Sequence, residues 1–117
     1  MSTVIEVSPH EAKIIIETHG PILLDTRDAH SYKEQHIDGA MLAHDSLTES
    51  LIKKKEYNRS IIVYCYQGIS SKDLAELLSK VGFKSVYSLK GGFTAWKSTF
   101  LENSVNTGAQ DKAGQGS

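Results

Sequence analysis

The sequence predicts an α/β domain with a mostly parallel central sheet and helices on both of its faces. Short apolar runs that are typical of buried strands alternate with helical patterns over about ninety residues. The chain has 117 residues, of which 39% are apolar and 23% are charged. This length and composition fit one globular domain with a substantial core. We therefore expect a single domain over residues 1–101.

The first half of the chain should open with a strand over Val4–Val7 and continue into a helix over 9–18. Ser8 and Glu11 have the capping-box spacing, and Pro9 occupies the first helical position. Gly20 should end this helix. The next expected elements are a strand over 22–24 that is buried on both faces, a short helix over 30–35, a brief strand over 40–43 and a helix over 46–54.

The second half should contain a strand over 61–64, a loop that begins at Cys65 and a helix over 71–81. Four apolar residues of that helix have the spacing of a single apolar stripe, namely Leu74, Leu77, Leu78 and Val81. A strand over 85–88, a turn at Gly91 and Gly92, and a last helix that starts at Phe93 and places Trp96 in the core should follow. Residues 102–117 have almost no large apolar side chains, so we expect them to form a disordered tail.

Charge and composition argue against several classes of function. The net charge of −1 argues against a nucleic-acid-binding protein, whose domain is usually basic. The N-terminus has no secretory signal pattern, and no apolar run is long enough to span a membrane. A single cysteine can form neither an internal disulfide nor a thiolate metal site. We therefore expect a cytoplasmic, reduced protein that uses neither nucleic acid nor membrane as a partner.

Cys65 is the residue that most directly suggests chemistry. It stands between a buried strand and the start of a helix, where backbone N–H groups and the helix dipole favour a thiolate or another anion. Gly68 allows the loop to curl, and the hydroxyls of Ser70 and Ser71 add donors. Asp25 ends another buried strand, and ligands of parallel sheets bind at such ends. The alternative is that Cys65 is an inert core residue.

Two kinds of chemistry use a cysteine loop of this type. Cysteine phosphatases with a Cys-x5-Arg loop need the arginine to hold the phosphoryl group. This chain has Ser71 at that position and Lys72 as the nearest cation in the sequence, which argues against phosphoryl transfer. Sulfur transfer needs only a thiolate that attacks a sulfane sulfur and N–H groups that hold the resulting persulfide.

Four segments together resemble the rhodanese-like sulfurtransferases, and among these the small single-domain thiosulfate sulfurtransferases of the GlpE type. The segments occur in the family's order and lie within residues 4–98: Leu23-Leu24-Asp25-Thr26-Arg27-Asp28, His36-Ile37-Asp38-Gly39-Ala40, Val63-Tyr64-Cys65-Tyr66-Gln67-Gly68-Ile69-Ser70-Ser71 and Val86-Tyr87-Ser88-Leu89-Lys90-Gly91-Gly92-Phe93-Thr94-Ala95-Trp96.

The resemblance implies a rhodanese fold in which Cys65 carries a persulfide between donor and acceptor. The donor would be thiosulfate, a small anion, and the acceptor cyanide or a thiol such as that of thioredoxin, without a metal or an organic cofactor. The substrate cradle implied by the resemblance consists of Tyr66, Gln67, Gly68, Ile69, Ser70 and Ser71.

Three further side chains have expected roles. Asp25 and Arg27 should form a structural ion pair, and Arg27 is also the best side-chain candidate for drawing anions toward the pocket. The resemblance implies a structural role for His36. Gln67 and Ile69 replace the His and Asn of many short loops of this family, which leaves the substrate preference open.

Two other functions stay open at the level of sequence. The protein could relay persulfide sulfur from a protein or polysulfide donor. It could also be a non-catalytic rhodanese-like module that binds a partner or senses redox state through reversible oxidation of Cys65.

Overall fold

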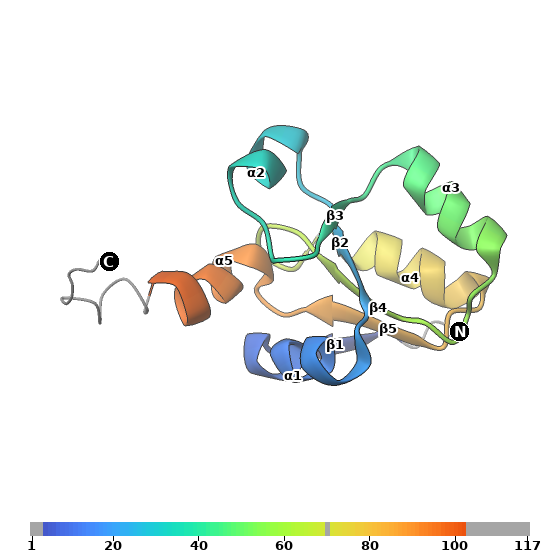
Figure 1. Cartoon of the computed structure of the whole chain (residues 1–117), viewed down its shortest axis with the longest axis horizontal. Helices are drawn as coiled ribbons and strands as arrows, with labels where there is room; N and C mark the ends of the chain where they lie inside the picture. The colour runs from blue at the N-terminus through green and yellow to red at the C-terminus, as the bar shows by residue number, and fades with distance from the viewer. Residues whose placement is uncertain (1–3, 70, 103–117) are drawn as a thin grey trace.

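The computed structural model describes residues 4–69 and 71–102, whose strands form one five-stranded sheet in the order β1-β5-β4-β2-β3 (Figure 1). Every strand pairing in this sheet is parallel. The strands are β1 (Ile5–Val7), β2 (Ile22–Asp25), β3 (Met41–Leu42), β4 (Ser60–Tyr64) and β5 (Ser85–Leu89). The predicted parallel α/β class is therefore confirmed.

Helices connect the strands, as parallel pairing requires. They are α1 (Pro9–His19), α2 (Ala29–Glu34), α3 (Asp45–Lys54), α4 (Ser71–Val81) and α5 (Gly92–Trp96), followed by the π-helical turn η1 (Lys97–Glu102). Glu102, which the sequence assigned to the disordered tail, thus ends η1, and residues 103–117 lie outside the described part. None of the described helices is long and apolar enough to cross a membrane.

The two faces of the sheet bury separate apolar clusters. On β4, Ile62 and Tyr64 belong to the cluster covered by α1 and α5, whereas Ile61 and Val63 belong to the cluster covered by α3 and α4. This division follows from the alternation of side chains along a strand. Figure 1 shows α1 on the opposite side of the sheet from α3 and α4. The predicted cover of both faces is confirmed.

Local capping explains where two of the helices begin. The Ser8 hydroxyl accepts a bond from the Glu11 amide at 3.1 Å, and the Ser8 amide donates to the Glu11 carboxylate at 2.8 Å, which confirms the predicted capping box. The ring Nδ1 of His44 accepts from the Leu47 amide at 3.3 Å and caps α3. The sequence did not suggest this role because His is not a preferred capping residue.

The buried stripe of α4 differs from the predicted one. Leu77 is 45% exposed, whereas Ser71, Ala75 and Leu78 are fully buried. Successive residues of a helix are rotated by roughly 100°, so Leu77 points well away from the direction that these three residues share. Leu77, which the sequence placed in the apolar stripe of this helix, therefore does not pack on the sheet.

Candidate active site

Cys65 lies at the carboxyl end of the central strand β4. This strand pairs with β2 on one side and β5 on the other, so the loops that follow all three strands meet around the cysteine. The Cys65 side chain is buried, with 3% of the residue exposed. The predicted position of the thiol at a strand-to-helix turn is confirmed by the start of α4 at Ser71.

The loop after Cys65 folds back over the sulfur atom. The Gly68 amide donates a hydrogen bond to Cys65 Sγ at 3.1 Å. Gly68 has a φ of +83°, and a Cβ atom there would lie 2.9 Å from the Gly91 nitrogen and 3.0 Å from the Leu89 oxygen. Only glycine fits this position without a shift of the neighbouring backbone. The structure thus provides one backbone donor of the predicted cradle.

Backbone amides at the start of α5 donate hydrogen bonds to the cysteine loop. The Phe93 amide donates to the Cys65 carbonyl at 2.7 Å, and the Thr94 amide donates to the Tyr66 carbonyl at 3.0 Å. A Cβ atom on Gly92 would lie 2.5 Å from the Cys65 oxygen and 2.6 Å from the Tyr66 carbonyl group. The glycine pair that the sequence predicted only as a turn therefore includes Gly92, which is in close contact with the cysteine loop.

The Tyr66 side chain ties the cysteine loop to α2. Its hydroxyl donates to Asp28 Oδ1 at 2.8 Å and also contacts the Ser31 hydroxyl, while Asp28 caps α2. The hydrogen bond from Tyr66, together with those from Ser31, lowers the pKa of Asp28 to about 2. Tyr66 contributes its carbonyl to the loop's anchoring and its side chain to the contact with α2.

The lowered pKa of Asp28 predicts a pH dependence of stability. Because the carboxylate is bonded only in the folded chain, its contribution is fully present above about pH 4 and is lost as the pH falls toward about 2. We expect Asp28→Asn to weaken this dependence, measured by urea unfolding between pH 2 and 5. Asp38→Asn, at an exposed carboxylate, is the control and should leave the wild-type slope unchanged. An unaltered slope in Asp28→Asn would contradict the prediction.

Asp25 and Arg27 form the predicted ion pair. Arg27 Nη2 lies 2.7 Å from Asp25 Oδ2, and Arg27 Nε lies 3.0 Å from Asp25 Oδ1. The same Nη2 donates to the Gln35 carbonyl at 2.6 Å. Burial disfavours the charged guanidinium, but the hydrogen bonds and charge of Asp25 outweigh it and raise the pKa of Arg27. The predicted ion pair between Asp25 and Arg27 is therefore confirmed.

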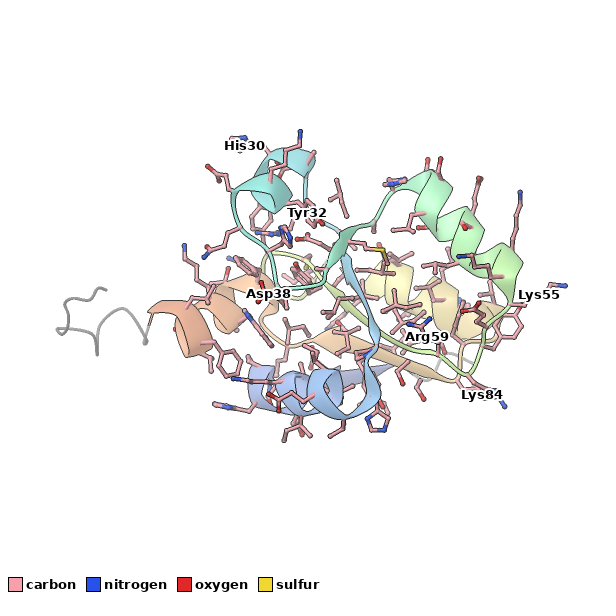
Figure 2. The ribbon with its side chains drawn as sticks, in the orientation of Figure 1. His30, Tyr32, Asp38, Lys55, Arg59 and Lys84 are labelled. Carbon is pink, nitrogen blue, oxygen red and sulfur yellow. The ribbon has the colours of Figure 1, made fainter. Side chains whose placement is uncertain are left out.

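Four other basic side chains either contact an acidic side chain or lie at the far end of the molecule. Lys72 Nζ, the nearest cation in the sequence, lies 3.5 Å from the Glu6 carboxylate on β1. Figure 2 shows Lys55, Arg59 and Lys84 at the end of the molecule opposite to α2, which corresponds to the amino ends of β4 and β5. Backbone amides and the start of α4 contribute positive potential at Cys65.

Comparison with known proteins decides the family. The family model described as the rhodanese-like domain matches residues 8–99. The chain belongs to the rhodanese-like domain family. A protein named thiosulfate sulfurtransferase GlpE from Actinobacillus pleuropneumoniae serotype 7 is 38% identical over 99 residues, which are 85% of this chain and 92% of the relative. The protein of the same name from Coxiella burnetii is 38% identical over 101 residues, which are 86% and 94% of the two chains.

Solved structures agree with this assignment. The solution structure of the rhodanese-like domain of the Alr3790 protein from Anabaena sp. has a TM-score of 0.70 and 30% sequence identity to this rhodanese-like domain. The alignment covers 92% of this chain and 89% of the other. The predicted rhodanese fold is therefore confirmed.

The remaining residues of the predicted cradle differ from one another in how far they are exposed. Gln67 and Ile69 are exposed, and 73% of Ile69 is accessible. Ser71 is fully buried, and its hydroxyl has no hydrogen-bond partner among the described residues. Ser70 lies outside the described residues. Substrate binding by these residues stays a prediction.

His36 has the contacts of a structural residue. Its Nδ1 lies 2.6 Å from the Tyr32 carbonyl, and its ring stacks on Tyr32 with centroids 4.0 Å apart and an interplanar angle of 7°. Figure 2 shows Tyr32 on α2. These contacts support the implied structural role and hold the segment after α2 in place.

A cavity of about 680 Å³ adjoins the loop on the side of Tyr66. Arg27, Tyr66, Phe93 and Lys97 are among the residues that line it. Arg27 thus faces the cavity while it is bonded to Asp25, so its expected attraction of anions stays a prediction. In the described part of the chain, no group of three or more His, Cys, Asp or Glu side chains could hold a metal ion.

Proposed function

We propose that this rhodanese-like domain is a thiosulfate sulfurtransferase that carries sulfane sulfur on Cys65. The observation that carries the proposal is the bond from the Gly68 amide to Cys65 Sγ, at 3.1 Å, in a loop that begins a helix. This arrangement favours negative charge on sulfur. The names of the relatives from Actinobacillus pleuropneumoniae and Coxiella burnetii support thiosulfate as the donor.

The first half-reaction loads sulfur onto the protein. The Cys65 thiolate attacks the sulfane sulfur of thiosulfate and forms a new S–S bond. The S–S bond of thiosulfate breaks, and sulfite leaves with the electron pair. The product is a persulfide whose terminal sulfur carries the negative charge, and backbone N–H groups of the loop would bind it.

The second half-reaction returns the thiolate. Cyanide attacks the terminal sulfur, a C–S bond forms, and the S–S bond to Cys65 breaks with its electron pair moving to Sγ. Thiocyanate leaves, and a thiol acceptor would take the sulfur in the same way. The hydrogen bond from the Gly68 amide to Sγ stabilises the leaving thiolate.

The structure also supports a role for acceptors larger than cyanide. The cavity of about 680 Å³ beside Tyr66 offers more room than cyanide needs. We propose a thiol acceptor for this side of the loop, with thioredoxin as a candidate, in the reducing environment of the cytoplasm. Arg27 and Lys97 on the cavity wall would attract an anionic thiol.

Steady-state kinetics with thiosulfate and cyanide test this function. Because the sulfur is held covalently between two half-reactions, double-reciprocal plots at several cyanide concentrations should give parallel lines. Thiocyanate formation that requires polysulfide in place of thiosulfate would favour a persulfide relay. Persulfide formation without transfer to any acceptor would favour the redox-sensing or binding module. Intersecting lines would contradict the covalent mechanism.

The domain boundary gives a separate prediction. We propose that residues 1–101 form the functional domain, because the sheet and both core clusters lie within residues 4–102. Removal of residues 104–117 should therefore leave the rate of thiocyanate formation and the unfolding midpoint unchanged. Both are measured on the truncated and full-length chains. A large loss of either would show that these residues contribute to the domain.

A further inference from the structure

Two buried hydroxyls near the cysteine lack partners. Among the described residues that are not exposed, only Ser71 Oγ and Ser88 Oγ are buried side-chain polar atoms without a hydrogen-bond partner. Ser71 is 0% exposed and Ser88 is 1% exposed. An unpartnered buried hydroxyl costs stability, so each such group calls for an explanation.

The strand register places Ser88 on the same face of the sheet as Cys65. Ser88 pairs with Val63, which lies in the cluster covered by α4. Cys65 follows Val63 by two residues and Ser88 follows Val86 by two, and Val86 lies in the same cluster. Because side chains alternate along a strand, both Cys65 and Ser88 belong to this face.

Helix α4 brings Ser71 to the end of the sheet where Cys65 lies. Ser71, Ala75 and Leu78 form the buried stripe of α4, and Ala75 and Leu78 pack in that cluster. Ser71 is the first residue of the helix and therefore lies beyond Ala75, toward the carboxyl ends of β4 and β5. Ser71 thus lies at the end of this apolar layer nearest the cysteine loop, and Ser88 lies beside Val63, two residues before Cys65 along the sheet.

We infer that the Ser71 and Ser88 hydroxyls are donors to the extra sulfur that Cys65 carries as a persulfide, and that Ser88 is a residue of the sulfur site. A persulfide extends the cysteine side chain by one S–S bond of about 2 Å and adds a negative terminal atom. This atom supplies the acceptor that both hydroxyls lack in the sulfur-free protein. The inference rests on the proposed role of Cys65 as sulfur carrier.

The matched pair Ser88→Thr and Ser88→Val tests this inference. The two side chains have nearly the same shape, so any packing strain is common to both and only the hydroxyl differs. Cys65 is loaded with inorganic polysulfide, which does not depend on activity with thiosulfate. The protein is then equilibrated with fixed polysulfide and increasing sulfide, which attacks the terminal sulfur and leaves as hydrogen disulfide, and intact mass gives the persulfide fraction.

We expect the sulfide concentration that discharges half of the persulfide to be about tenfold lower in Ser88→Val than in Ser88→Thr, since a bond to a charged group is lost. Ser85→Ala, at the amino end of β5, is the control and should match wild type. Equal values for the matched pair would overturn the inference. If neither variant folds, the same half-discharge concentrations are compared between Ser88→Ala and wild type, and equal values would again overturn the inference.

A second measurement separates a sulfur contact from a structural role. Persulfide should raise the melting temperature of Ser88→Thr more than that of Ser88→Val, because only Thr gains a bond to the sulfur. The charged and titratable residues on the elements around Cys65 are the same in both variants: Asp25, Arg27, Tyr66, Lys72, Asp73 and Lys90. Equal shifts, or failure of polysulfide to load a folded protein, would contradict the inference. Failure with thiosulfate alone would contradict only the proposed function.

Discussion

Cys65→Ser should form no thiocyanate above background and should keep the fold of the wild-type protein. The hydroxyl is smaller than the thiol but similar in shape, and the Gly68 amide can still donate to it across the 3.1 Å contact. Oxygen cannot carry the sulfane sulfur as a persulfide, so both half-reactions are lost. Thiocyanate formation from thiosulfate and cyanide measures the activity.

The control for Cys65→Ser is its unfolding transition. A variant with wild-type circular dichroism and a similar melting temperature shows that the loss is chemical. The chain has one cysteine, so no other thiol can substitute for it. Sulfur transfer that persists in Cys65→Ser would contradict the assignment of Cys65.

Gly92→Ala should have the largest effect on the shape of the cysteine loop. Gly92 has a φ of +59°, and an added Cβ would lie 2.5 Å from the Cys65 oxygen. The loop would have to move away from α5 and break the bond from the Phe93 amide to that oxygen. We expect a loss of about 3 kcal/mol or more in the free energy of unfolding. The rate of thiocyanate formation should fall at least about 100-fold.

Gly20→Ala provides the matched control. Gly20 has a similar φ of +55°, but nothing lies within 4 Å of an added Cβ. This variant should lose only about 1–2 kcal/mol, the cost of the left-handed conformation, and should keep full activity. Urea unfolding and the thiocyanate assay compare the two variants. Equal losses of stability and activity would show that the contact of Gly92 with the loop is unimportant.

The fold could be predicted from the sequence because its signals are local. The capping box at Ser8, the buried run over 22–24 and the strand before Cys65 each depend on neighbouring residues, and the structure has all three. The position of the thiol at a strand end followed from the same signals. Leu77 was misplaced because periodicity alone does not show which side of a broad apolar stripe turns inward.

The contacts that shape the site could not be predicted in this way. The bond from Tyr66 to Asp28 joins residues 38 positions apart, and Gly92 meets Cys65 only because β5 lies beside β4. The partnerless hydroxyl of Ser88 likewise depends on strand register and on the packing of α4. The Gly91-Gly92 pair was visible in the sequence only as a turn.

The most direct test of sulfur transfer through Cys65 is the intact mass of the wild-type protein after incubation with thiosulfate. Our account predicts the addition of one sulfur atom, its removal by cyanide with release of an equal amount of thiocyanate, and no addition to Cys65→Ser. A wild-type protein that gains no sulfur from thiosulfate, or a Cys65→Ser variant that gains as much as wild type, would contradict it.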